Sequence, residues 1–154
     1  MEDRLVEITV RRSIDELQAE FALASKFLVA FMWLERTLLI NPDFRQNGIY
    51  AISWSAVKQA LRESGMNVLP DCLHPLCTDP PKTRGADGKW KRRQQGLVPT
   101  LANALECLRR MRNNLAHGSK SEGAFDRNNE LLNEGLKVLA YIDSEGIARR
   151  LVKN

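Results

Sequence analysis

The sequence predicts an all-α protein, a four- to five-helix up-and-down bundle with a long first helix and a long loop between its second and third helices. Apolar residues recur three and four positions apart in several segments. Helix start and stop signals flank those segments, and no stretch reads convincingly as a strand. The length of 154 residues suits a single domain over 1–154 with room for a core.

The first helix is expected from Ser13 to about Ile40. Ser13 followed by Glu16 is a capping-box pattern, and Asn41-Pro42 should end the helix. Glu35 occupies a position on the apolar stripe of this helix. The stripe is predicted to consist of Leu17, Phe21, Ala24, Leu28, Phe31 and Leu38. Residues 27–34 are apolar on every side, so we expect this part to be covered on more than one side, by its own bundle or by another subunit.

The other helices are shorter. They are expected at residues 53–64, closed by Gly65, from Pro99 to His117, from about Asp126 to Ser144, and at 145–152. Their inward residues should be Leu101, Leu105, Leu108, Leu115, Leu132, Leu136, Leu139 and Ile142. Residues 66–98 are rich in proline and are predicted to form a long surface loop, a kind of segment that is often functional.

Positive charge is concentrated within that loop. Residues 82–93 hold six lysines and arginines and one aspartate, a net charge of +5, whereas the whole chain carries +4. Such a basic patch favours a polyanionic partner such as RNA, because contacts to phosphates release counterions. The candidate RNA-binding residues are Lys89, Trp90, Lys91, Arg92 and Arg93, with Trp90 able to stack on a base. The alternative is a solvated, flexible loop with no ligand.

The sequence argues against a secreted, a membrane-spanning or a disulfide-rich protein. The start Met1-Glu2-Asp3-Arg4 does not resemble a secretory leader. The longest apolar run, residues 27–34, is far shorter than the roughly 20 residues of a membrane-spanning helix. Three cysteines are an odd number, which argues against a disulfide framework. We therefore expect a cytoplasmic protein without a membrane partner.

The segment around Arg112 and His117 is the most informative for function. Arg112 lies on the stripe of the third helix between Leu108 and Leu115, where a charge needs an acidic partner or an anion. His117 lies five residues further on, roughly 140° around a regular helix. Either the helix ends between the two residues or a second subunit completes the site. Asn113 shares a helical face with His117.

This set of residues suits RNA cleavage without a metal. A histidine with a pKa near 6.5 can move the proton of a ribose 2′-OH or of the leaving oxygen. Arg112 can stabilise charge on the phosphorus in the transition state, and Asn113 can orient either group. The alternative is structural, with Arg112 paired to Glu35 and His117 interacting with the helix dipole.

The same segment resembles the signature of the HEPN superfamily (higher eukaryotes and prokaryotes nucleotide-binding domains). That signature is an arginine, usually a polar residue, a few more residues and a histidine, here Arg112, Asn113 and His117. The resemblance extends to residues 31–35, where many members carry an aromatic residue followed by an acidic or amide residue, here Glu35. It implies a helical bundle and, in many members, a metal-independent ribonuclease whose two subunits bring both motifs to one cleft. It further implies that Glu35 orients Arg112.

One position departs from a branch of this family that is controlled by a nucleotidyltransferase antitoxin. That branch has a tyrosine two residues after the histidine, and this chain has Ser119. Control by modification of that tyrosine is therefore not expected here.

The sequence thus predicts a metal-independent endoribonuclease, a possible toxin or defence effector, that needs no cofactor. Its catalytic residues would be Arg112, His117, Asn113 and Glu35, with Arg109 among the RNA contacts. Its partners would be RNA, a second copy in a homodimer, and an antitoxin or other regulatory protein. The alternative is a non-catalytic HEPN-like module that binds a nucleotide, RNA or a protein.

A second motif contains residue types that can bind zinc. Cys72, His74 and Cys77 supply three soft ligands within six residues, but no fourth ligand is evident. Ordinary loop residues are the favoured interpretation, and no metal is predicted.

Overall fold

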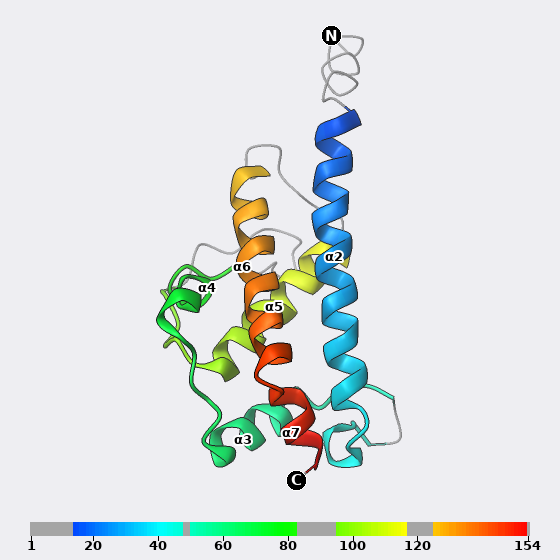
Figure 1. The fold of residues 1–154 in the computed structure, drawn as a ribbon, viewed down its shortest axis with the longest axis vertical. Coiled ribbons are helices and arrows are strands. Elements are labelled where there is room, and N and C mark those ends of the chain that lie inside the picture. The colour runs from blue at the N-terminus through cyan, green and yellow to red at the C-terminus, as the bar shows by residue number, and fades with distance from the viewer. Residues whose placement is uncertain (1–13, 48–49, 83–94, 117–124, 154) are drawn as a thin grey trace, which may run out of the picture.

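The protein is all-α. The computed structural model describes residues 14–47, 50–82, 95–116 and 125–153 (Figure 1). These residues contain no strand, and their one isolated β-bridge joins Arg45 to Ile52.

The helices lie within two residues of the predicted positions at every described end. They are α2 (Ile14–Leu38), α3 (Trp54–Ser64), α5 (Leu101–Ala116), α6 (Phe125–Ser144) and α7 (Ile147–Lys153). A four-residue helix, α4 (Pro75–Thr78), and two 3-10 turns, Pro42–Phe44 and Asp71–Leu73, were not predicted. Gly65 ends α3 at φ 73°, a left-handed conformation that glycine adopts at little cost.

The three long helices alternate in direction, as in an up-and-down bundle. In Figure 1, α2 runs down one side, α5 returns obliquely, and α6 descends again. Helix α2 packs along α6 and α7 and crosses α5, while α3 lies across the lower end. The first turns of α2 project past the upper end of α6.

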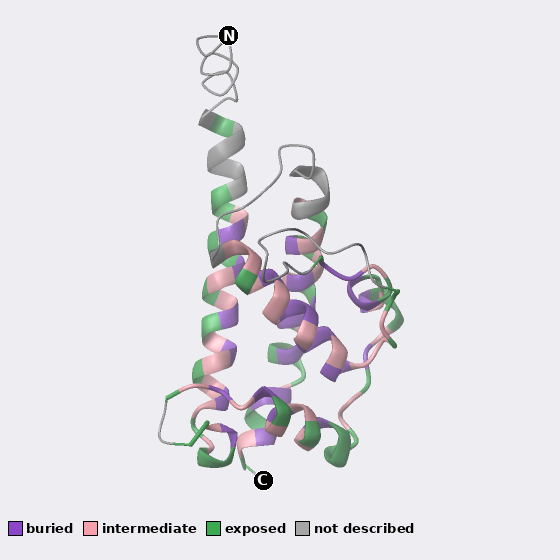
Figure 2. Cartoon of the chain, turned by 180° about the vertical axis from the view of Figure 1, so that it is seen from behind, coloured by how far each residue is buried: buried purple, intermediate pink, exposed green. Residues whose placement is uncertain are grey.

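The core lies between α2, α5, α6 and the short helices. In Figure 2, the buried residues, coloured purple, lie on the inward faces of these helices. The largest fully buried residues include Phe27, Phe31, Leu34, Leu38, Leu61, Leu76, Leu101, Leu108 and Ile142. The predicted stripes of α5 and α6 are confirmed, with Leu115 and Leu136 half-buried and the other six residues buried.

The predicted stripe of α2 was partly wrong. Phe21 is 67% exposed and Leu28 is only partly buried. Phe27 and Leu34 take their places, and they lie with Phe31 on one face. The difference arises because residues 27–34 are apolar all round, so periodicity alone does not say which face the partner helices cover.

The predicted loop at 66–98 also needs correction in its first half. Leu69, Leu73 and Leu76 are buried, and their spacing of four and three residues is helical. The His74 ring binds the Leu69 carbonyl (Nε2 to O, 2.8 Å) and holds this segment on the bundle. Proline therefore starts α4 at Pro75 instead of keeping the segment extended.

The chain returns to α4 at Gly96. A Cβ at this residue would lie 2.6 Å from the Thr78 carbonyl oxygen, so only glycine allows the approach. The Leu97 amide then donates to the Cys77 carbonyl at 2.8 Å. Residues 83–94, which include most of the basic run, lie outside the described part of the chain.

Gly135 of α6 packs closely against residues of both other long helices. A Cβ there would lie 2.9 Å from Met111 Cε and 3.0 Å from the Phe27 ring. Gly135→Leu should therefore lower the free energy of unfolding by about 1–3 kcal/mol through overpacking. Chemical denaturation measures this, beside Asn133→Leu at an exposed position of α6, which should stay within about 0.5 kcal/mol of wild type. Equal losses in both variants would contradict the close packing.

Candidate functional site

Arg112 lies where α5 crosses α2, and the predicted pairing with Glu35 is confirmed. Its Nη1 is 3.9 Å from Glu35 Oε1, and both side chains are half-buried. Its guanidinium carbon lies 5.4 Å from the centre of the Phe31 ring, a cation–π distance. The arginine is thus held between an aromatic face and a carboxylate, both supplied by α2.

The pairing leaves Arg112 with donors to spare. A separation of 3.9 Å is an ion pair but too long for a direct hydrogen bond. The Arg112 Nε atom is buried and has no hydrogen-bond partner among the described residues. A guanidinium carries five N–H donors. The Arg112 guanidinium can therefore bind an anion and keep its contact with Glu35.

Burial acts against the charge on Glu35. It raises the pKa of Glu35 above its ordinary value, and the nearby Arg112 charge offsets this only in part. The pair is therefore a poor source of stability, in line with the general cost of burying ion pairs. Its position next to the motif favours a role in orienting Arg112.

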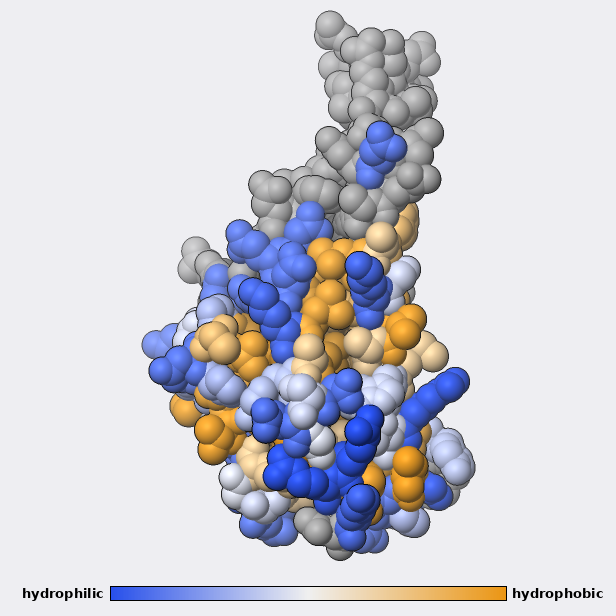
Figure 3. All heavy atoms as spheres, in the orientation of Figure 1, coloured by the Kyte–Doolittle hydropathy of each residue, from blue (hydrophilic) through white to orange (hydrophobic). Residues whose placement is uncertain are grey.

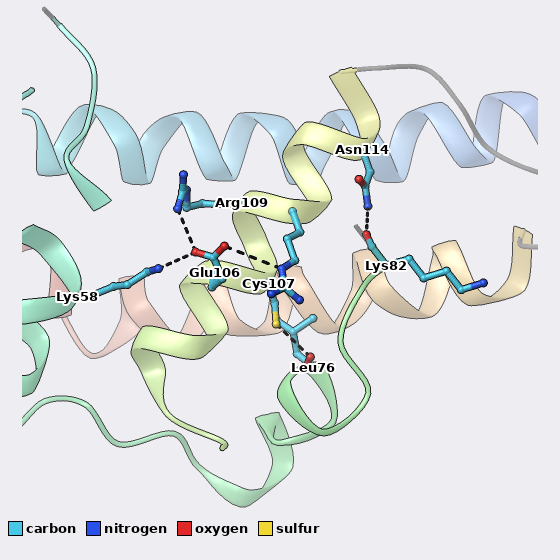
Figure 4. A network of polar contacts seen from close by, with 8 residues as sticks. Lys58, Leu76, Lys82, Glu106, Cys107, Arg109 and Asn114 are labelled. Atoms are coloured by element: carbon cyan, nitrogen blue, oxygen red, sulfur yellow. Dashed lines mark hydrogen bonds and ion pairs between the residues drawn. The ribbon is translucent and has the colours of Figure 1, made fainter. Parts of the chain in front are cut away.

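A second cluster of charges surrounds Glu106 on the same helix (Figure 4). Lys58 Nζ of α3 lies 2.6 Å from Glu106 Oε2, and Arg109 Nη1 lies 3.0 Å from the same oxygen. Arg110 Nε is 4.0 Å from Oε1. Three cations thus share one carboxylate. Burial alone would raise the pKa of Glu106, but the hydrogen bond from Lys58 and the three positive charges hold it below its ordinary value.

Two stacked aromatic rings join this cluster to Arg112. The Arg109 guanidinium carbon lies 5.6 Å from the Trp54 ring centre. Trp54 stacks with Phe31 at a centroid distance of 5.7 Å, and Phe31 faces Arg112. Arg109 and Arg112 therefore flank a single aromatic pair, one helical turn apart on α5.

The motif asparagines differ in their surroundings. Asn113 is exposed on α5, and its orienting role stays a prediction. Asn114 Nδ2 donates to the Lys82 carbonyl at 2.9 Å. The first residue of the basic run is thus fixed beside the Arg112 segment (Figure 4).

Several predicted residues lie outside the described part of the chain. They are His117, which directly follows the last described residue of α5, and Lys89, Trp90, Lys91, Arg92 and Arg93. Conversely, sequence reasoning missed Lys58, Trp54 and Glu106. Glu106 had a signal in its spacing of three and four residues before Arg109 and Arg110. Lys58 had none, since its contact spans 48 residues.

The cysteine-rich motif serves the core. Cys72 is exposed, whereas Cys77 is buried. The Cys107 thiol donates to the Leu76 carbonyl at 3.4 Å, and its contact with Cys77 together with burial raises its pKa far above the ordinary value. Cys107 is therefore a neutral structural thiol. Among the described residues, no three histidine, cysteine, aspartate or glutamate side chains gather as a metal site would require.

Comparison of the chain with protein-family models, with curated proteins and with solved structures found no match. The resemblance to HEPN proteins therefore rests on the residues of the motif and their surroundings. Within the described ranges, no helix is both long enough and apolar enough to cross a membrane.

Because the pKa of Glu35 is raised, ionisation of this residue at higher pH should lower the stability of the fold. The contribution of protonated Glu35 to stability is fully present below its ordinary pKa of 4.5. It is lost as the pH rises through the raised pKa of Glu35 in the folded protein. A neutral glutamine avoids this loss, so Glu35→Gln should gain stability relative to wild type between about pH 4 and about pH 7. Denaturation at both pH values tests this, beside the exposed Glu145→Gln. A relative loss for Glu35→Gln at the higher pH would show that the charged pair stabilises the fold.

Proposed function

We propose that this protein is a HEPN-type, metal-independent endoribonuclease whose site is centred on Arg112 and His117. One observation carries the proposal. Arg112 is half-buried, incompletely paired and placed one turn before the end of the described helix that leads into His117. An arginine with free donors in a partly desolvated position is suited to a phosphate, which takes up the unmatched charge.

The surrounding charge favours RNA as the ligand. Around Arg112, the α5 surface carries Arg109 and Arg110, and the basic run begins beside Asn114. Several positive charges close together suit a strand of phosphates better than a single small anion. The residues 89–93 would extend this contact.

The reaction needs only groups of the chain and of the RNA. His117 would remove the proton of the ribose 2′-OH, and the 2′-oxygen would attack the adjacent phosphorus. The P–O5′ bond breaks and the 5′-oxygen takes up a proton. The products are a 2′,3′-cyclic phosphate and a 5′-hydroxyl end. Arg112 stabilises the charge that builds on the phosphoryl oxygens, while Glu35 holds the guanidinium in place.

An exposed apolar face of α2 supports a homodimer. Phe21 and Val29 are each 67% exposed and Met32 is 49% exposed. Their spacing of eight and three residues puts them on one side of the helix. In Figure 3, apolar side chains reach the surface between α6 and α2, below the grey atoms. A second copy would cover such a face and would bring a second motif close to the first.

The cellular setting follows from the activity. A nuclease that cuts RNA without a cofactor would act in the cytoplasm, and the free thiols of Cys72, Cys77 and Cys107 suit that reducing compartment. Unrestrained, it would be harmful, which fits a toxin or defence effector held in check by an antitoxin or other regulatory protein.

The activity is tested by incubating purified protein with single-stranded RNA in the presence of a chelator. Wild type should cut, and Arg112→Ala should lose about 100- to 1,000-fold in rate, as when a transition-state donor is removed. His117→Ala should lose as much or more, and the double variant should be far from additive because the two residues act together. The rate under single-turnover conditions is the readout.

The matched control is Arg149→Ala, an exposed arginine of α7, which should cut at the wild-type rate. Binding of RNA without cleavage would favour the non-catalytic alternative. Activity that the chelator abolishes would require a metal-dependent hydrolysis and contradict the proposal.

The dimer is tested by sedimentation at micromolar concentration. Wild type should sediment as a dimer, and Val29→Glu should shift it towards monomer by placing a charge on the apolar face of α2. Val68→Glu, at another exposed apolar position, should leave the dimer intact. A monomeric wild type would remove the basis for a site shared between two subunits.

A further inference from the structure

We propose that Lys58, Arg109 and Arg110 form a second phosphate subsite around Glu106, which binds the RNA phosphate next to the scissile one. The inference rests on the proposed function and extends it. It identifies a contact from α3 that lies outside the motif, and it gives the bound strand a direction, from Arg112 towards α3.

The cluster carries an excess of positive charge. Glu106 is the one acidic partner that the described residues provide for these three cations, so the cluster carries a net charge of +2. All four side chains are at least two-thirds buried, which weakens screening by solvent. Like charges held this close repel one another, and a bound phosphate would relieve that repulsion.

The cluster also has hydrogen-bond donors that Glu106 does not use. The Arg109 Nε atom is buried and has no hydrogen-bond partner among the residues described, although Nη1 of the same group binds Glu106. Lys58 uses one of its three donors on Glu106. Lys58, whose side chain is 21% exposed, thus keeps donors for an incoming anion while the cluster stays assembled around the carboxylate.

The cluster lies next to Arg112 along α5. Arg109 and Arg112 are three residues apart, about one helical turn, and each guanidinium lies against one ring of the stacked Trp54–Phe31 pair. A phosphate at each arginine would lie at neighbouring positions along one strand. Lys58 would then mark the side on which the strand continues.

Glu106 has two opposite effects on the proposed subsite. Its negative charge holds the three cations together and also repels an incoming phosphate. Removing its charge should therefore raise the affinity for RNA, whereas removing Lys58 should lower it. A purely structural salt-bridge cluster predicts lower stability for both variants and no opposite effects on binding.

The experiment measures binding of a 2′-O-methylated RNA oligonucleotide, which resists cleavage, by fluorescence anisotropy at several salt concentrations. Lys58→Met should weaken binding about three- to tenfold and reduce the slope of log affinity against log salt by about 0.7. Glu106→Gln should tighten binding several-fold. Lys137→Met, an exposed lysine on α6, is the matched control and should match wild type.

Cleavage separates this proposal from the one on which it rests. With unmodified RNA, Lys58→Met should raise KM for a trinucleotide several times more than KM for a dinucleotide, which has one phosphodiester only. Wild-type cleavage and binding with no effect of Lys58→Met or Glu106→Gln would overturn the subsite and leave the proposed function standing. A wild type that neither binds nor cuts RNA would overturn both. Thermal melting of each variant shows that a change in binding is not a loss of fold.

Discussion

The ion pair between Arg112 and Glu35, made where α5 crosses α2, is the interaction around which the rest of this site is arranged. It places a positive charge in a partly desolvated position, against the Phe31 ring. Burial raises the pKa of Glu35, and Arg112 offsets this only in part, so the pair costs the fold more than a well-packed apolar contact would. Such an arrangement is reasonable when the arginine has a ligand, because a phosphate uses the donors that Glu35 leaves free.

Helix α5 serves two environments at once. One face carries Leu101, Leu105 and Leu108 into the core and is fixed by α2, α6 and the short helix α4. The other face carries Glu106, Arg109, Arg110 and Asn113. Because α5 cannot rotate without disrupting the core, the orientation of its polar face is fixed. A rigid helix places functional groups more accurately than a loop does, which suits a site that depends on electrostatic positioning.

Much of the fold could be predicted because helix periodicity and capping are local properties of the sequence. The Arg112–Glu35 pair could be predicted too, since both residues occupy apolar-stripe positions. The exposure of Phe21 could not, because several faces of an all-apolar stretch look equivalent until the partner helices are known. The contact of Lys58 with Glu106 depends on how α3 packs on α5, and no sequence spacing encodes that.

The most direct measurement uses a DNA oligonucleotide that contains one ribonucleotide, treated with the protein in the presence of a chelator. If Arg112 and His117 direct attack by the 2′-oxygen, cleavage must occur only on the 3′ side of that ribonucleotide. The upstream fragment must end in a 2′,3′-cyclic phosphate and the downstream fragment must begin with a 5′-hydroxyl. Fragments with 3′-hydroxyl and 5′-phosphate ends, or cuts at the deoxyribonucleotides, would contradict the account, since neither outcome uses a ribose 2′-OH as the nucleophile.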